Sequence, residues 1–95
     1  MAIKVVIERR VKKGMDMDLA KLMRELRAKA ILAQGYISGE TLRAHDDPAF
    51  YLVISTWKSL EGWETWEKDS VRKEIQRKID SILEIPTQMR IFDFA

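Results

Sequence analysis

The 95-residue chain is 46% hydrophobic and 34% charged, which predicts one globular domain over residues 1–95 and excludes disordered and low-complexity classes. Its 17 basic and 15 acidic residues leave a net charge of +2, too small to indicate binding to nucleic acid or to an anionic membrane. Because cysteine is absent and histidine occurs once, iron–sulfur clusters and thiolate- or histidine-rich metal sites are excluded, and we expect neither a metal nor a cofactor.

The first predicted element is a strand over residues 2–11, in which Ile3, Val5 and Ile7 alternate with mostly charged side chains. Charge arrives too early in this segment for a secretory signal, and no apolar run approaches the roughly 20 residues of a membrane span. We therefore expect a cytoplasmic protein whose first strand has one apolar face to bury.

A helix is predicted next, beginning at Asp16 or Asp18, either of which can cap a helix start, and ending near Gly35. Its apolar side chains recur at helical spacing: Leu19, Leu22, Met23, Leu26, Ala30 and Ala33. A polar segment over residues 36–45 forms the second strand and, after a turn, a third strand covers residues 49–57. Apolar residues follow one another in that third strand, which indicates that both of its faces are covered.

Ser59 offers a cap for a second helical region, in which apolar residues recur about every 3.7 positions. These apolar residues are Leu60, Trp63, Trp66, Val71, Ile75, Ile79 and Ile82. Asp69 and Ser70 can restart a helix, so we expect two helical pieces. Pro86 ends the region, and the alternation over residues 87–94 predicts a final strand.

The element order β-α-β-β-α-β predicts a ferredoxin-like α+β sandwich with an antiparallel sheet. Helices cover one side of such a sheet, yet the third and fourth strands carry apolar side chains on both faces. In these strands Tyr51, Val53 and Trp57 oppose Phe50, Leu52 and Ile54, and Phe92 and Phe94 oppose Met89 and Ile91. The sheet of a second copy is the simplest cover, so we expect a homodimer.

Residues 45–66 contain a recognisable pattern: an acidic turn with proline, a hydrophobic strand ending at Trp57, a cap at Ser59 followed by Glu61, and an aromatic residue at Trp66. With this pattern the chain resembles the antibiotic biosynthesis monooxygenase family over nearly its whole length. The resemblance implies a dimeric α/β barrel with a ligand cavity between helices and sheet in each subunit. Some members oxygenate polycyclic phenols without metal or flavin, and others degrade heme. Trp66 matches the helix tryptophan that donates a hydrogen bond.

Two positions depart from the pattern of the heme-degrading members. Ile7 stands where they carry an asparagine, a residue type that this chain lacks, and Gln76 stands where they place the histidine that binds iron. Glutamine is a poor iron ligand, so heme is not expected. The single histidine, His45, lies beside two aspartates and could act as a base, but the segment is more typical of a turn.

The remaining candidates each have two interpretations. Trp63 and Trp66 share one helix face, where they pack in the core, the favoured interpretation, or border a flat aromatic ligand. Arg9 shares the strand parity of Ile7 and can point into the cavity to stabilise a phenolate or carboxylate, although exposure near the strand end is favoured. A solvated helix face, rather than RNA binding, explains the basic group Arg72, Lys73, Arg77 and Lys78.

Together these observations predict a cofactor-independent monooxygenase that binds a small planar aromatic or quinol-type substrate between helices and sheet. Trp66 is the expected catalytic residue, and the expected substrate-binding residues are Ile7, Arg9, Trp63 and Gln76. The alternative is a non-catalytic dimeric ligand-binding module of the same fold, which the missing asparagine and histidine favour. The expected partners are a second copy and a small aromatic molecule, and neither nucleic acid nor membrane.

Overall fold

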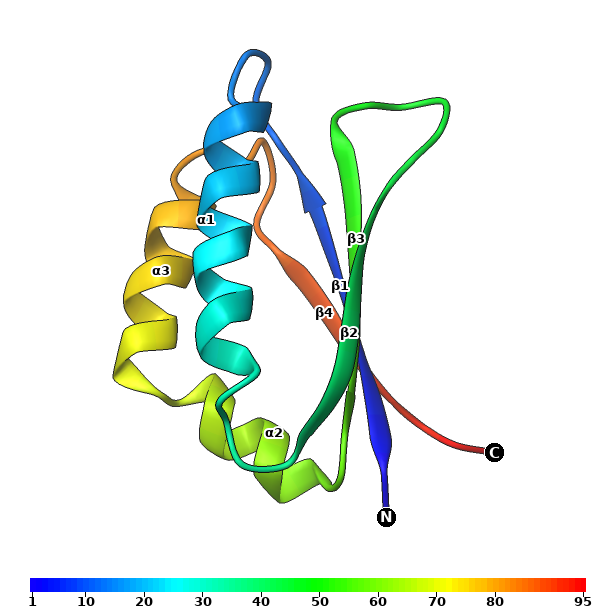
Figure 1. Cartoon of the computed structure of the whole chain (residues 1–95). Coiled ribbons are helices and arrows are strands. Elements are labelled where there is room, and N and C mark those ends of the chain that lie inside the picture. The colour runs from blue at the N-terminus through cyan, green and yellow to red at the C-terminus, as the bar shows by residue number, and fades with distance from the viewer.

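A computed structural model describes residues 1–95, and its four-stranded antiparallel sheet has the order β2-β3-β1-β4. All three helices lie on one side of this sheet and leave the other side bare (Figure 1). The predicted ferredoxin-like α+β fold is therefore confirmed. None of the helices has the length and hydrophobicity of a transmembrane segment. In chain order the elements are β1 (Ile3–Arg10), α1 (Asp16–Ala30), β2 (Tyr36–Arg43), β3 (Phe50–Trp57), α2 (Leu60–Glu67), α3 (Ser70–Asp80) and β4 (Gln88–Asp93).

The first helix differs from its prediction at both ends. Met15 occupies the N-cap position without a side-chain hydrogen bond, and both aspartates lie in the first turn instead. There their negative charge still favours the helix N-terminus. The helix ends at Ala30 rather than near Gly35, and irregular turns connect it to β2. Gly35 has a φ of 92°, a conformation open mainly to glycine, and it turns the chain into β2.

The second helical region is broken into two pieces, as predicted. The Ser59 side chain accepts a hydrogen bond from the Gly62 amide at 3.1 Å and caps α2. The Asp69 carboxylate accepts hydrogen bonds from the amides of Val71 and Arg72 at 2.9 and 3.1 Å and caps α3. These caps satisfy amides that each helix start leaves without an intrahelical partner. The break therefore gives each piece its own direction over the sheet.

Strand register assigns the two faces of the sheet. The odd-numbered residues of β1 face the helices, where Ile7 pairs with Val53 and Arg9 with Tyr51. The even-numbered residues face the bare side, where apolar side chains from three strands are only partly covered or exposed, namely Val6, Phe50, Leu52, Ile54 and Phe92. The sheet does not close on itself within one chain. This side is the surface to which the expectation of a second copy applies.

Buried apolar residues form two groups under the helices. The tryptophan cluster contains Ile3, Val5, Ile7, Ala30, Trp57, Trp63 and Trp66. The aliphatic cluster contains Val11, Leu19, Met23, Tyr51, Ile75, Ile79 and Leu83. Leu26 and Val53 pack against both clusters. The tryptophan cluster lies where β1 begins and the aliphatic cluster where β1 ends, so the core has two chemically different halves.

Candidate functional site

A cavity of about 60 Å³ lies between the helices and the sheet, beside the tryptophan cluster. Four of the residues selected from the sequence line it: Ile7, Arg9, Trp63 and Trp66. Side chains of α1, the edge strand β2 and α3 complete the wall, including Met23, Leu26, Arg27, Tyr36 and Arg72. The cavity is much smaller than the roughly 300–1,000 Å³ of pockets that hold drug-sized ligands. It therefore has room for a small group, and a whole aromatic ring requires its wall to move.

Aromatic side chains form one wall through edge-to-face contacts. The ring of Trp57 meets those of Tyr36 and Trp63 at centroid distances of 5.4 and 5.6 Å. The indole N–H of Trp57 donates to Ser55 Oγ at 3.0 Å, whereas the buried indole N–H of Trp63 has no partner. Trp66 is buried and lines the same cavity. The unsatisfied buried donor thus belongs to Trp63, while the sequence pattern had indicated Trp66.

Arg9 is the most deeply buried charged residue of the site, with 2% of its surface exposed. The favoured interpretation of an exposed strand end is therefore wrong, because the helix-facing side of β1 is covered as far as Val11. Arg9 Nη2 donates to Gln76 Oε1 at 2.8 Å, but the buried Nε has no partner. Burial, and to a lesser extent the Arg72 charge, lowers the pKa of Arg9 to about 10.

Gln76 does not line the cavity and instead holds Arg9 in place. Its Nε2 donates to Asp80 Oδ1 at 2.9 Å and to Thr87 Oγ1 at 3.1 Å, and Thr87 in turn donates to Asp80 at 2.8 Å. These bonds orient the amide so that its oxygen faces the guanidinium. Asp80 makes no direct contact with Arg9, but its negative charge raises the pKa of Arg9, as the smallest of the three effects on that pKa.

Arg72 was not among the predicted site residues, yet it lines the cavity and is 9% exposed. Its guanidinium carbon lies 5.2 Å from the centroid of the Trp63 ring, and its Nη1 donates to the Glu67 carbonyl at 3.4 Å. Burial lowers the pKa of Arg72, and the charges of Glu67 and Asp80 act in the opposite direction. A cation above an aromatic face is an attractive arrangement.

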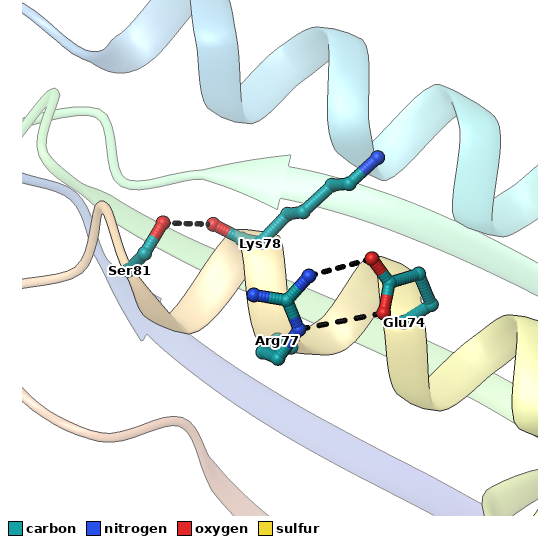
Figure 2. A network of polar contacts seen from close by, with 4 residues as sticks. All are labelled: Glu74, Arg77, Lys78 and Ser81. Atoms are coloured by element: carbon teal, nitrogen blue, oxygen red, sulfur yellow. Dashed lines mark hydrogen bonds and ion pairs between the residues drawn. The ribbon is translucent and has the colours of Figure 1, made fainter.

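The assignment of Arg72 to a solvated face is wrong, although Ile75 and Ile79 of the predicted apolar stripe are buried as expected. The predicted apolar stripe ran through Val71, which is 46% exposed. The buried residues of α3 are Arg72, Ile75 and Ile79, at the spacing i, i+3, i+7. The outer face of α3 carries Arg77, whose Nη2 lies 2.6 Å from Glu74 Oε1 (Figure 2).

One hydrogen bond crosses the mouth of the cavity between α1 and the edge strand. Arg27 Nη2 donates to the Gly39 carbonyl at 3.0 Å, and both residues line the cavity. The Tyr36 hydroxyl lies directly over Gly39, where a Cβ atom would come within 2.7 Å of it. Because the Arg27 bond is exposed, water can replace it at little cost. The contact between Arg27 and Gly39 therefore adds little to the stability of the fold.

His45 lies outside this arrangement. It is exposed in the connection between β2 and β3 and does not line the cavity. The neighbouring Asp47 accepts hydrogen bonds from Arg10 at 2.7 Å and from the Ala49 amide at 3.2 Å. The Arg10 bond, followed by the amide bond, lowers the pKa of Asp47. These contacts fit the interpretation of the segment as a turn.

Comparison with known proteins adds a family and a set of related folds. Residues 2–78 match the model of the family described as antibiotic biosynthesis monooxygenase. Among curated proteins none matches the sequence. A conserved Methanosarcina mazei protein superposes with a TM-score of 0.95 at 20% identity, covering 100% of this chain and 94% of that one.

Two further solved structures have the same fold at lower identity. SnoaB, a cofactor-independent oxygenase from Streptomyces nogalater, gives a TM-score of 0.90 at 13% identity, with 99% of this chain and 93% of SnoaB covered. Protein Rv0793 from Mycobacterium tuberculosis gives 0.92 at 9% identity, with 100% and 96% covered. At these identities the likeness shows the fold, so the function depends on the site itself.

Proposed function

Because the chain belongs to the antibiotic biosynthesis monooxygenase family, we propose that it oxygenates a small planar aromatic or quinol-type substrate held between helices and sheet. The supporting observation is the cavity, which is walled by tryptophans and contains donor groups without partners. No cofactor is needed in this proposal, a mode of action that the name of SnoaB assigns to that protein. The fold alone is shared by proteins of many functions, so the donors carry the argument.

The proposed reaction requires the substrate to supply all the electrons. A deprotonated quinol or phenol donates electrons to O2, and a C–O bond forms at a ring carbon that loses its hydrogen. The O–O bond breaks, the ring system is oxidised to a quinone, and the second oxygen atom leaves as water. The protein must then stabilise the anion and keep bulk water away. The buried N–H groups of Trp63 and Arg9 are donors already in place for an anionic oxygen. Trp66 and Ile7 bound the ring, and Gln76 keeps Arg9 oriented.

The volume of the cavity limits the number of rings that the substrate can have. A benzene ring occupies an engineered protein cavity of about 150 Å³, whereas this cavity has about 60 Å³. One ring can enter if the Arg27–Gly39 bond opens and the flexible Met23 side chain moves. A three-ring substrate needs far more displacement. The proposal therefore favours a one-ring quinol over the polycyclic phenols associated with some family members.

A homodimer is part of this proposal. The bare side of the sheet carries Phe50, Leu52, Ile54 and Phe92, and Phe92 is 45% exposed. Contiguous apolar surface of this kind favours a partner, and a second copy offers the same face. Sedimentation velocity tests it: a dimer is expected for the native chain, and Leu52→Lys should shift the population toward monomer. Sedimentation of the native chain as a monomer would contradict this part.

Oxygen uptake tests the activity. The pure protein, incubated with a hydroquinone or with anthrone, should consume O2 above the uncatalysed rate, faster with the one-ring substrate. Trp63→Phe and Trp66→Phe each keep an aromatic ring but remove an indole N–H, so a loss of rate identifies the donor. Leu60→Ala, at an exposed position of the same helix, is the control. An uptake equal to background with every substrate would overturn the oxygenase proposal.

The second candidate function is a non-catalytic ligand-binding module. Ile7 favours it, because this buried position lines the cavity with an apolar side chain where heme-degrading relatives are expected to carry an asparagine. Such a protein would bind a quinol and quench tryptophan fluorescence without O2 uptake. Substituting Ile7→Asn separates the two candidates: a gain of uptake would show that the scaffold is competent and that the native chain only binds.

A further inference from the structure

Two buried arginines line the same cavity, and neither forms an ion pair. The ion pairs of the chain are Arg10–Asp47 and Arg77–Glu74, both away from the cavity. Arg9 is 2% exposed and Arg72 is 9% exposed. Arginine is rarely buried without a negatively charged partner, because the charge loses its hydration. The site therefore contains more positive charge than the chain itself neutralises.

The contacts that these arginines do make leave part of each guanidinium unused. Arg9 Nη2 donates to Gln76, and the buried Nε of Arg9 has no hydrogen-bond partner. Arg72 Nη1 donates to a backbone carbonyl at 3.4 Å, near the distance limit for a hydrogen bond, and the guanidinium lies over the Trp63 ring. Each guanidinium has five N–H donors in a planar fork. Most of these donors remain available to a ligand.

The two charges also repel each other across the site. The Arg72 charge contributes, after burial, to the lowered pKa of Arg9. The charge of Asp80 raises the pKa of both arginines, but Asp80 contacts neither of them and instead accepts a hydrogen bond from Gln76. An anion placed between the guanidinium groups would remove the repulsion and supply the missing hydrogen-bond acceptors. The native chain offers no residue that does so.

We propose that Arg9 and Arg72 together bind the carboxylate of the ligand, so that the one-ring quinol-type substrate of the proposed function also carries an acid group. A carboxylate matches the guanidinium fork in charge and in planar shape. Its small size suits the cavity of about 60 Å³, with the ring directed toward Trp66 and the mouth at Gly39. The site already proposed for oxygenation is the same one, and carboxylate binding refines that proposal without requiring O2.

Gln76 acts here as a positioning residue. Because Asp80 and Thr87 fix its amide, its oxygen holds one edge of Arg9 and leaves the other edge facing the ligand. Gln76→Leu should weaken binding of a carboxylate more than binding of a neutral analogue of the same shape. Gln76→Glu would place a carboxylate beside Arg9 and compete with the ligand, so it should abolish the preference for an acid.

Benzoate and benzamide form a matched pair of probes, since they share size and shape and differ in charge. Calorimetric titration of the full chain under argon should show benzoate binding at least about tenfold more tightly than benzamide. Arg72→Gln should reduce this ratio to near one. Arg77→Gln, on the outer face of the same helix and already paired with Glu74, should leave it unchanged. Argon keeps this result independent of any oxygenase activity.

A structural role for the arginines predicts different results. If Arg9 only supports the fold, then Arg9→Met lowers the melting temperature and leaves the ratio of benzoate to benzamide affinity intact. The proposal expects the reverse, namely a higher melting temperature and a ratio near one. Equal binding of the two probes to the native chain, or no binding of benzoate at millimolar concentration, would overturn it. Tighter binding of phenyl phosphate than of benzoate would overturn the assignment to a carboxylate.

Discussion

The two halves of the core differ in what they bury. The aliphatic cluster encloses Leu19 and Ile79 completely and contains no buried polar side-chain atom without a partner. The tryptophan cluster borders a cavity, and beside it lie two buried arginines and two donor groups that lack acceptors, Arg9 Nε and Trp63 Nε1. Both halves occupy one sheet under the same helices, so their difference does not come from the fold.

This contrast separates stability from function. Close apolar packing stabilises a domain by about 1.5–3 kcal/mol for each large side chain that it buries. An unpaired charge or donor in the same position has the opposite effect. Natural proteins tolerate such groups mainly at functional sites. The aliphatic half accordingly contributes to stability alone, and the tryptophan half is the part for which we propose a ligand.

The largest expected effect tests the aliphatic half. Ile79 is fully buried there, so Ile79→Ala removes packed methyl groups and leaves a void. We expect the free energy of unfolding to fall by about 2–4 kcal/mol, measured by urea denaturation. Any protein that remains folded should keep its preference for benzoate over benzamide. A selective loss of that preference would show that the two halves are not separable.

An effect of opposite sign is expected in the tryptophan half. The lowered pKa of Arg9, about 10, corresponds to a burial penalty of about 3 kcal/mol at neutral pH. Arg9→Met removes the charge but also the bond to Gln76, worth about 1 kcal/mol. The net expectation is a rise in unfolding free energy of about 1–2 kcal/mol, measured in the same urea experiment. A fall of that size would mean that Arg9 stabilises the fold.

The pH dependence of this difference sharpens the comparison. Below pH 10 Arg9 is charged in both folded and unfolded chains, so the advantage of Arg9→Met should be constant. Between about pH 10 and the higher pKa that arginine has in the unfolded chain, the native side chain loses its proton on folding. The burial penalty is then relieved, and the advantage of Arg9→Met should shrink. Melting curves of both proteins from neutral pH to about pH 11 measure it. A constant difference across this range would contradict the lowered pKa of Arg9.

The smallest effect on stability is expected at the mouth. Arg27→Ala removes one exposed hydrogen bond to Gly39, so the unfolding free energy should change by less than about 0.5–1 kcal/mol. Association of benzoate, followed by stopped-flow tryptophan fluorescence, should become faster because the entrance is less obstructed. Lys29 is exposed and lies two residues further along the same helix, so Lys29→Ala provides the control. Unchanged association rates would place the entrance elsewhere.

Periodicity and capping residues were sufficient to predict the fold. Alternation identified β1 and β4, and Ser59 and Asp69 marked the two starts of the second helical region, because each rule depends on neighbouring residues alone. The same rules failed where several chemically equal caps were present. Asp16 and Asp18 both suited a helix start, yet the helix begins immediately after Met15.

The site was less accessible to sequence reasoning. Strand parity correctly placed Arg9 beside Ile7 on the helix-facing side, but general experience with arginine favoured exposure. Arg72 was missed because its charge grouped it with the exposed basic residues of the helix, although it lies three residues before the buried Ile75. The cavity itself depends on the packing of side chains from six elements. No local pattern contains that information.

The tyrosine that lies over Gly39 has an evolutionary consequence. Any side chain at position 39 would come within 2.7 Å of the Tyr36 hydroxyl and force the ring to shift, so the two positions constrain each other. Homologous chains with the same cavity mouth should therefore carry tyrosine and glycine together, three residues apart on the edge strand. Chains that carry a side chain at position 39 should have lost the tyrosine, and with it the same choice of substrates. This covariation gives a way to sort the family by entrance shape before any ligand is known.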